Sequence, residues 1–554
     1  MALGGFLPAY LSASYLWLSV CCLLILAPIF TLLYDITLWK RMPPGPPPLP
    51  FIGNKHQLPK TQPWHQLAAW SKEYGPIFTL WIGRRPTVVI SDPAIAAELM
   101  EKRSNKYSSR PRMVAMGELL WEGGSILVQP YGKPWLARRK LLHQALTPTA
   151  LRAYKPIQEA EAARLAAQLV ADPANFEKLI ERFTASVVFS VAYGHRIDSL
   201  SAAVVAQRFE FMQYSASLNV PGKYLVETFP LLKHVPAVLA PWKADIQAHG
   251  RREAAANMAL VDVVRGDMAR AAAGGKPSAV PDSLCKMLLE LRAAGPAATD
   301  LAPLSDRDFA FIPASLFGAG ADTTASTLCT ALLALVTHPH ALAAAHAELD
   351  AVVGAARCPT FADEPRLPYL RALVKEVLRW RPVAVLGGTP HASTADDVYA
   401  GWRIPAGTTV LANSWAINLH PDYYPDPHAF EPLRFHDDVA LRPRRLVGPK
   451  AHPSPRGHSS FGWGRRICPG AGLAENSVWA VLARLLWAFD VLPAEGRVYD
   501  TLAYTDGFNI RPKKFECVIR PRSSAHEELV TREAARAMEV LARFEPFGDA
   551  KQDA

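Results

Sequence analysis

Apolar residues recur every three to four positions over most of the chain, the spacing that places them on one face of an α-helix. Short apolar runs typical of strands are fewer. We therefore expect a mainly α-helical body with a small β part. The predicted helices cover residues 64–74, 93–101, 133–146, 150–170, 176–193, 245–271, 305–338, 365–380 and 470–486, and the predicted strands cover 77–81, 87–90, 397–400 and 408–411.

A longer apolar segment precedes this body. Residues 10–34 carry no formal charge, and as a helix they would span about 37 Å, against a hydrocarbon core of about 30 Å. No Lys or Arg occurs before Lys40 and Arg41, so the positive-inside bias leaves the body in the cytosol. A cleaved signal peptide is the alternative, but its apolar region would be shorter and preceded by basic residues. The segment predicts a single-pass membrane anchor.

The pattern divides the chain into four parts. Residues 1–34 form the anchor, and residues 35–50 form a linker whose Pro-rich run favours a stiff, extended spacer. Residues 51–522 form the folded body. Residues 523–554 form a charged tail, with a helix expected near 527–544 and no assigned function.

Composition excludes several classes of protein. Half of the 554 residues are hydrophobic and 20% are charged, so the chain is not intrinsically disordered. The seven cysteines include no C-x-x-C pair, which argues against a disulfide scaffold or a structural zinc site. The net charge of +10 is compatible with nucleic acid, an anionic membrane or an acidic protein partner, but no nucleic-acid-binding motif accompanies it.

The strongest chemical signal is the segment 461–470. Its spaced glycines allow a tight loop, and a helix follows, so backbone amides and a helix N-terminus favour a thiolate at the cysteine. A structural cysteine in a Gly-rich turn is the alternative. The segment resembles the haem-binding loop of the cytochrome P-450 superfamily, whose pattern F-x-x-G-x-R-x-C-x-G is matched by Phe461, Gly464, Arg466, Cys468 and Gly470.

A second signal lies within an apolar helical run. Asp322 and Thr323 interrupt the segment 309–336, and a buried carboxyl group is costly unless it is paired or has a task. A second membrane span or a kinked core helix would also explain the run. The sequence 319–324 resembles the central-helix motif of the same superfamily. That resemblance implies that Asp322 and Thr323 deliver protons during dioxygen activation.

Three charged residues match two further motifs of the superfamily. Glu376 and Arg379 form an E-x-x-R, which alone is weak because the chain contains at least three others. Their position after the Asp-Thr helix and before Cys468 selects this pair, and the sequence 430–435 matches F-x-P-x-R-F. The resemblance implies a structural charge triad of Glu376, Arg379 and Arg434 behind the haem.

Further residues match positions that hold the haem propionates in the superfamily. Trp135 and Arg139 fit W-x-x-x-R, and His391 occupies the position of a His or Arg. A basic helix face and a solvent-exposed histidine are the plain alternatives.

The resemblance covers about residues 43–522 and implies a fold and an activity. The fold would be a triangular, helical haem domain, and the cofactor haem b (iron protoporphyrin IX), with Cys468 as the axial ligand of the iron. The enzyme would insert one oxygen atom from O2 into a small organic substrate. Electrons would come from NADPH through cytochrome P-450 reductase, with cytochrome b5 as a possible second donor. The location would be the endoplasmic reticulum membrane.

The resemblance is strongest to fungal enzymes of secondary metabolism of the O-methylsterigmatocystin oxidoreductase type. Four segments placed by the family would line an apolar pocket, which favours an apolar or aromatic substrate. Two alternatives are a haem-thiolate isomerase or dehydratase that does not use O2, and a membrane-tethered haem sensor. The pocket segments are 110–128, 214–228, 383–389 and 504–508, and Lys133, Arg138, Lys140 and Arg465 are expected to face the reductase.

Overall fold

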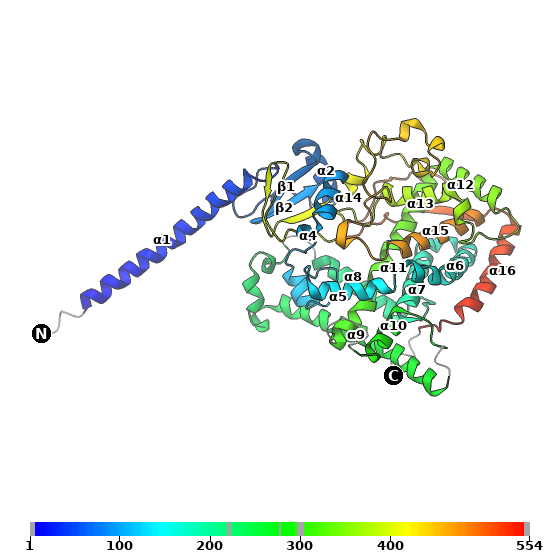
Figure 1. Ribbon diagram of the computed structural model, residues 1–554, viewed down its shortest axis with the longest axis horizontal. Helices are drawn as coiled ribbons and strands as arrows, with labels where there is room; N and C mark the ends of the chain where they lie inside the picture. Colours follow the sequence, from blue (N-terminus) through cyan, green and yellow to red (C-terminus); the bar gives the residue numbers. More distant parts are fainter. Residues whose placement is uncertain (1–5, 219–222, 276–278, 296–303, 548–554) are drawn as a thin grey trace.

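The computed structural model describes residues 6–218, 223–275, 279–295 and 304–547. Within these ranges the body is mainly helical with small sheets, as predicted, and the long helix α1 (Phe6–Trp39) projects away from it (Figure 1). Two helices among the described residues are long and apolar enough to cross a membrane. In the most apolar 18-residue stretch of Trp17–Trp39 0% of the residues are buried, whereas in that of α11 (Asp306–Thr337) 78% are buried. Helix α11 is therefore a core helix, and α1 is the candidate membrane span.

Most predicted helices are present with small shifts at their ends. The predicted helix 93–101 differs, since it is a short α3 (Pro93–Ala96) followed by a π-helical turn (Ala97–Lys102). The others are α2 (Pro63–Tyr74), α5 (Lys133–Gln144), α6 (Pro148–Ala171), α7 (Phe176–Tyr193), α9 (Pro241–Ala273), α11, α13 (Pro368–Trp380) and α15 (Ala471–Ala488).

Several helices were not predicted from the sequence. In α8 (Ala203–Leu218) the buried positions include Arg208 and Ser215. The buried face therefore lacks the continuous apolar pattern from which a helix is predicted. In α12 (Pro339–Val352) small alanines surround the helix and blur the contrast between its faces. The other unpredicted α-helices are α4 (Ser104–Tyr107), α10 (Leu284–Ala293) and α14 (Ser414–Asn418).

The β part consists of one four-stranded sheet and two antiparallel two-stranded sheets. The larger sheet has the order β1-β2-β6-β3, with β2 and β6 parallel and the other neighbours antiparallel. Strands β3, β5, β7 and β8 were not predicted. The strands are β1 (Ile77–Ile82), β2 (Arg85–Ile90), β3 (His391–Ala392), β4 (Asp397–Tyr399), β5 (Trp402–Ile404), β6 (Thr409–Ala412), β7 (Phe489–Pro493) and β8 (Cys517–Pro521).

Helix α11 runs through the centre of the body, next to α7 (Figure 1). The two helices approach closely at Gly320, where an added Cβ atom would lie 2.5 Å from Val188 Cγ1. Residues on both sides of this point belong to large apolar clusters that also include α15 and α13. The core therefore fixes the position of the polar residues in the middle of α11.

The anchor helix is attached to the body. It continues to Trp39, beyond the predicted anchor boundary at Tyr34. Asp35 pairs with Arg84 through two bonds of 2.7 and 3.0 Å, and Met42 is 1% exposed. The Pro44 carbonyl accepts a hydrogen bond from Thr79 in β1. The segment 35–50 is thus part helix and part docked against β1, whereas the sequence predicted a separate spacer.

The C-terminal segment also belongs to the folded body, as far as Phe547. Helix α16 (Ser524–Leu541) packs against α6, at the right of Figure 1. The following chain exchanges backbone hydrogen bonds with Arg196, whose amide donates to Glu545 and whose carbonyl accepts from Phe547. The Phe547 ring lies 5.1 Å from the Phe189 ring. The sequence placed a tail here; residues 548–554 lie outside the described residues.

We expect Phe547→Ala to lower the free energy of unfolding by about 3 kcal/mol, because a buried ring is lost from the contact with Phe189. The midpoint of chemical unfolding measures the change. A chain that stops after Phe547 is the control and should unfold like the full chain. Equal stability of Phe547→Ala and the full chain would show that the C-terminal segment does not contribute to the core.

Candidate active site

The segment 461–470 forms a closed loop before α15. The Cys468 amide donates to the Phe461 carbonyl at 2.8 Å, which joins the two ends of the loop. Gly462 and Gly464 have φ angles of 76° and 57°, which side chains rarely adopt. An added Cβ at Gly464 would lie 1.9 Å from the Met100 carbonyl oxygen. Both glycines are therefore required by the shape of this loop.

Cys468 lies just before Gly470, the N-terminal cap residue of α15. Cys468 is accessible from the surface, but enough protein surrounds its sulfur that burial raises the pKa of the thiol. The Gly470 amide and Arg139 act in the opposite direction and offset only part of this effect. The loop thus presents an accessible sulfur, but the protein alone does not favour the thiolate that the sequence analysis expected. A cation at the sulfur would be needed to displace the proton.

Three arginines gather beside the loop without a carboxylate among the described residues. Arg110 and Arg466 are buried, and Arg139 is partly buried. Burial lowers the pKa of Arg466 to about 9, and the Arg139 charge adds to this effect. Burial also lowers the pKa of Arg110, with contributions from Arg466 and Arg139. The cluster is a concentration of positive charge that the protein does not neutralise.

Backbone carbonyl groups hold these arginines in place. Arg139 Nη2 donates to the Ile467 carbonyl at 2.5 Å, Arg466 donates to the carbonyls of Ser108 and Gln129 at 2.7 Å, and Arg110 donates to the carbonyls of Leu127, Thr389 and Pro390. Carbonyl groups satisfy N–H donors but do not cancel a full charge. The arrangement therefore suits a ligand with negative charge.

The other predicted propionate residues lie around the same cluster. The Trp135 ring is 4.0 Å from Arg466 Cζ, and Trp135 and Arg139 share one face of α5. His391 donates from Nδ1 to the Tyr107 carbonyl at 2.7 Å. Burial, Arg110 and Arg466 lower the pKa of His391 to about 3, so its imidazole is neutral. The solvent-exposed histidine considered as an alternative is excluded, since His391 is buried.

Arg110 is the member of the cluster that the sequence analysis did not select. It lies in an irregular segment after α4, and no local motif marks it. Only the packing of this segment against residues 389 and 390 brings it to the cluster.

Asp322 and Thr323 lie in a short stretch of α11 that is less buried than the helix on either side of it. Ala319 is exposed and Gly320, Asp322 and Thr323 are partly buried, whereas most other α11 residues from Phe309 to Val336 are buried. Thr323 Oγ1 donates to the Ala319 carbonyl at 2.8 Å, a bond that weakens the helix locally. Burial raises the pKa of Asp322, which favours the protonated acid. The site thus combines a hydroxyl group with a carboxyl group able to hold a proton.

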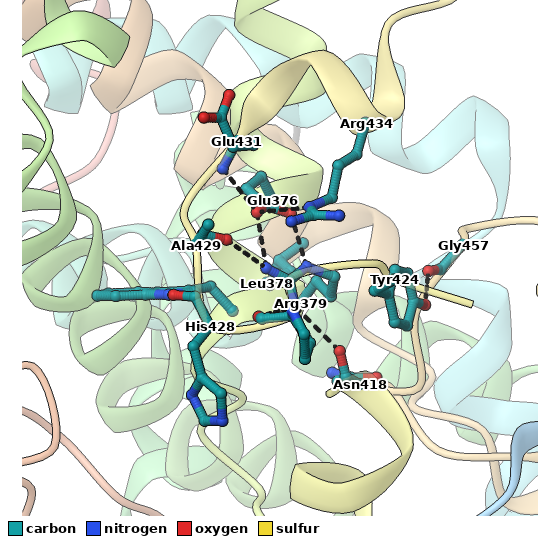
Figure 2. A network of polar contacts seen from close by, with 12 residues as sticks. Glu376, Leu378, Arg379, Asn418, Tyr424, His428, Ala429, Glu431, Arg434 and Gly457 are labelled. Atoms are coloured by element: carbon teal, nitrogen blue, oxygen red, sulfur yellow. Dashed lines mark hydrogen bonds and ion pairs between the residues drawn. The ribbon is translucent and has the colours of Figure 1, made fainter. Parts of the chain in front are cut away.

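The structure brings Glu376, Arg379 and Arg434 together (Figure 2). Glu376 and Arg379 are fully buried and form two bonds of 2.7 Å, while Arg434 Nε lies 3.5 Å from Glu376 Oε1. The Glu431 amide donates to Glu376 at 2.9 Å, and Arg379 donates to the carbonyls of Asn418, Pro427 and Ala429. This network ties α13 to residues 418–434.

The other E-x-x-R sequences have different surroundings. Glu161 pairs with Arg182 rather than Arg164. Glu533 pairs with Arg536 on the exposed face of α16. Burial distinguishes Glu376 from Glu533, whereas Glu161 is equally buried but is paired with α7 instead of the arginine of its own motif.

One sequence expectation about the surface is wrong. Arg138 was expected to face a redox partner, but it is buried, pairs with Asp308 at 3.0 Å and donates to the Gly123 carbonyl. Lys133, Lys140 and Arg465 are exposed, and Arg465 contacts Tyr131.

Comparison with known proteins identifies the family. The sequence model described as Cytochrome P450 matches residues 43–519. The chain belongs to the cytochrome P450 family. It is therefore a monooxygenase-type oxidoreductase of a haem-dependent family, and the fold expected from the resemblance is confirmed.

Its relatives are fungal cytochrome P450 monooxygenases. Cytochrome P450 monooxygenase 58 of Postia placenta is 38% identical over 87% of this chain and 89% of its own length. A cytochrome P450 monooxygenase of Armillaria gallica is 35% identical over 89% and 92% of the two chains. Another, from Clonostachys rogersoniana, is 32% identical over 94% of each chain. The narrower resemblance to the O-methylsterigmatocystin oxidoreductase type stays a prediction.

We expect Glu376→Gln to destabilise this P450 by about 3 kcal/mol, because Arg379 and Arg434 would remain buried without a counter-charge. Chemical unfolding measures the change. Glu533→Gln is the matched control, since it removes the acid of an exposed pair worth about 0.2–1 kcal/mol. Similar losses for both variants would show that burial does not set the importance of the triad.

Proposed function

We propose that this P450 binds haem b through the Cys468 thiolate and inserts one oxygen atom from O2 into an apolar or aromatic small molecule. The proposal rests on one observation: an accessible cysteine lies beside buried arginines whose hydrogen-bond partners are backbone carbonyl groups. Haem supplies dioxygen activation when it is bound. Its iron needs a thiolate, and its two propionates need cations.

The residues present fit this group. Cys468 is the accessible sulfur of the loop, and an iron ion would stabilise its thiolate against the effect of burial. Arg110, Arg139 and Arg466 would neutralise the propionates, with the Trp135 indole and His391 as neutral neighbours. We assign Phe461, Gly464 and Gly470 to the shape of the loop that presents the sulfur. The triad of Glu376, Arg379 and Arg434 supports the fold and takes no part in the chemistry.

Asp322 and Thr323 would hold and move protons. Burial raises the pKa of the Asp322 carboxyl group, which favours the protonated acid that proton delivery requires. Thr323 presents a hydroxyl group one residue further, at the interruption of α11. These groups favour an oxygen-activating enzyme over the isomerase, dehydratase or haem sensor.

The expected substrate segments lie next to one another in pairs. The Val114 and Ala115 amides both donate to Glu227, which joins segment 110–128 to segment 214–228. Residues 219–222 of the latter lie outside the described residues. The Ile510 amide donates to Val383, and the Phe508 ring lies 3.9 Å from the Cβ position of Gly388. The Glu227 carboxylate is thus occupied by the Val114 and Ala115 amides, and the apolar residues of the four segments are the basis on which we assign an apolar substrate.

Membrane association and a reductase complete the proposal. Helix α1 would anchor the protein in the endoplasmic reticulum membrane, and Lys40 and Arg41 would keep the body in the cytosol. Electrons would come from NADPH through cytochrome P-450 reductase, with cytochrome b5 as a second donor, near Lys133, Lys140 and Arg465. The role in secondary metabolism rests on the sequence resemblance to fungal enzymes of that kind, and the relatives are fungal monooxygenases.

Cys468→Ser should abolish the thiolate-type absorption of the reduced carbonyl complex, because an alcohol cannot replace the thiolate ligand. Cys517→Ser in β8 is the control and should keep that absorption. A thiolate-type band in Cys468→Ser would disprove the assignment. Incorporation of labelled O2 into product by the unmodified enzyme separates a monooxygenase from the isomerase and the sensor.

Thr323→Ala should retain haem but lower product formed per NADPH by roughly tenfold, since proton delivery loses a hydroxyl group. Released hydrogen peroxide should rise correspondingly. Thr327→Ala, one turn further along α11 with the same type of bond to a carbonyl, is the matched control. Unchanged coupling in Thr323→Ala would exclude this hydroxyl group from proton delivery.

A further inference from the structure

An open groove lies where the anchor helix meets the body. It has a volume of about 610 Å³, within the range of small-molecule sites. Lys40 and Arg41, which follow α1, line one side, and residues 396–398 and 401–403 of the β4–β5 pair and its edge line the other. We call it the anchor groove. None of these residues belongs to the candidate active site.

The two sides of the anchor groove are joined to each other. The Arg403 amide in β5 donates to the Arg41 carbonyl at 2.8 Å. Leu38 of α1, Met42 and Ile404 of β5 are buried in one apolar cluster. The fold therefore sets the position of the groove relative to α1, and the groove begins directly where that helix ends.

The two acidic residues of the groove already have partners. Asp397 is buried and pairs with Arg103 at 3.0 Å and with Lys106 at 2.7 Å. Asp396 pairs with Arg403 at 2.8 Å. Each carboxylate is thus offset by a basic residue of the protein itself.

The basic residues on the other side of the groove are not offset in this way. Lys40 and Arg41 are exposed, and among the described residues no hydrogen bond or ion pair engages either side chain. The groove therefore presents two positive charges without a counter-charge. Lysine and arginine side chains at one site bind phosphate groups well, since both supply several charged N–H donors.

The position of the groove relative to α1 indicates which phosphate would reach it. The segment Trp17–Trp39 would span about 34 Å as a helix, against a hydrocarbon core of about 30 Å. Lys40 and Arg41 come directly after this segment, so they would lie at the level of the lipid headgroups. A phospholipid phosphate would be the most concentrated anion at that level.

Apolar side chains are exposed on the same end of the body. Val398 in the groove is 61% exposed, and Leu49, Phe51 and Ile52 are also exposed. The Ile52 carbonyl accepts from Gly83 in the turn between β1 and β2, and α1 meets the body beside these strands (Figure 1). Apolar residues that gather at one end of a surface typically mark a contact with a membrane or a partner.

We propose that the anchor groove binds the headgroup of an anionic phospholipid from the membrane that holds α1. Lys40 and Arg41 would pair with the phosphate and the acidic headgroup, and Val398 would contact the glycerol region. The bound lipid would attach the β4–β5 pair to the membrane next to the anchor. The inference rests on the proposed membrane anchoring by α1 and on no step of the haem chemistry.

Native mass spectrometry of the full chain in detergent micelles tests the proposal by counting bound lipids. The probes are phosphatidylserine and phosphatidylcholine with identical acyl chains. The unmodified chain should bind one phosphatidylserine more tightly than phosphatidylcholine. Lys40→Gln and Arg41→Gln should each weaken that binding roughly fivefold, the contribution of one basic residue near an anionic membrane. Each variant keeps one basic residue after α1, so the orientation of the anchor is preserved.

Two further variants separate a site from general attraction by surface charge. Arg85→Gln removes the same charge next to Arg84, which pairs with Asp35 of α1, but it lies outside the groove. Its binding of phosphatidylserine should be nearly unchanged. Val398→Trp keeps the charge but narrows the groove, and it should weaken the binding. Equal losses in Arg85→Gln and Arg41→Gln, or full binding in Val398→Trp, would overturn the proposal.

The source of the phosphate and the role of the anchor are tested separately. Inorganic phosphate alone should give no adduct of comparable affinity, and such an adduct would replace the lipid by a free anion as the ligand. Retention of the full chain in membranes after alkaline extraction reports the anchoring by α1. A chain that stays in the membrane but binds phosphatidylserine equally in Lys40→Gln and Arg41→Gln would disprove the groove and leave the proposed function intact.

Discussion

The positive charge beside the cysteine loop is the constraint on which the arrangement of the site depends. Arg110, Arg139 and Arg466 come from three distant segments and meet in the interior with carbonyl partners only. Like charges at low dielectric repel one another, so such a cluster is costly unless an anion joins it. The fold therefore leaves positive charge here that an anionic ligand would offset. Binding of that ligand and stability of this region should be closely linked.

The second charged network has the opposite character. Glu376 is shared by Arg379 and Arg434, and the remaining donors of both arginines reach backbone carbonyls. The side chains of this network are paired within the protein. It is joined to the cysteine loop through Asn418, which accepts from the Ser459 amide, and through Ser460, which donates to the Leu378 carbonyl. A network in which one carboxylate offsets part of the charge of two arginines thus supports the loop, whereas the arginines beside the loop have carbonyl partners only.

The central helix shows how packing and chemistry are combined. Close contact at Gly320 fixes α11 against α7. Glu181 of α7 pairs with Arg511, and Asp322 of α11 accepts from Asn509, two residues earlier in the same segment. Helix α11 is apolar enough to resemble a membrane span, but its burial assigns it to the core. The polar residues Asp322 and Thr323 lie in a stretch of this helix that is less buried than the residues on either side of it.

The sequence by itself determined the features that lie within one continuous segment. The cysteine loop, the Asp-Thr motif and helix α7 were all predicted, because covalent spacing already places their residues on one loop or one helix face. Arg110, Asn509 and Arg511 carried no such signal, and the buried position of Arg138 reversed its expected role. The attachment of Phe547 to Phe189 likewise joins residues more than 350 positions apart. Only the tertiary structure could decide these contacts, because they depend on how whole helices and loops pack against one another rather than on local periodicity.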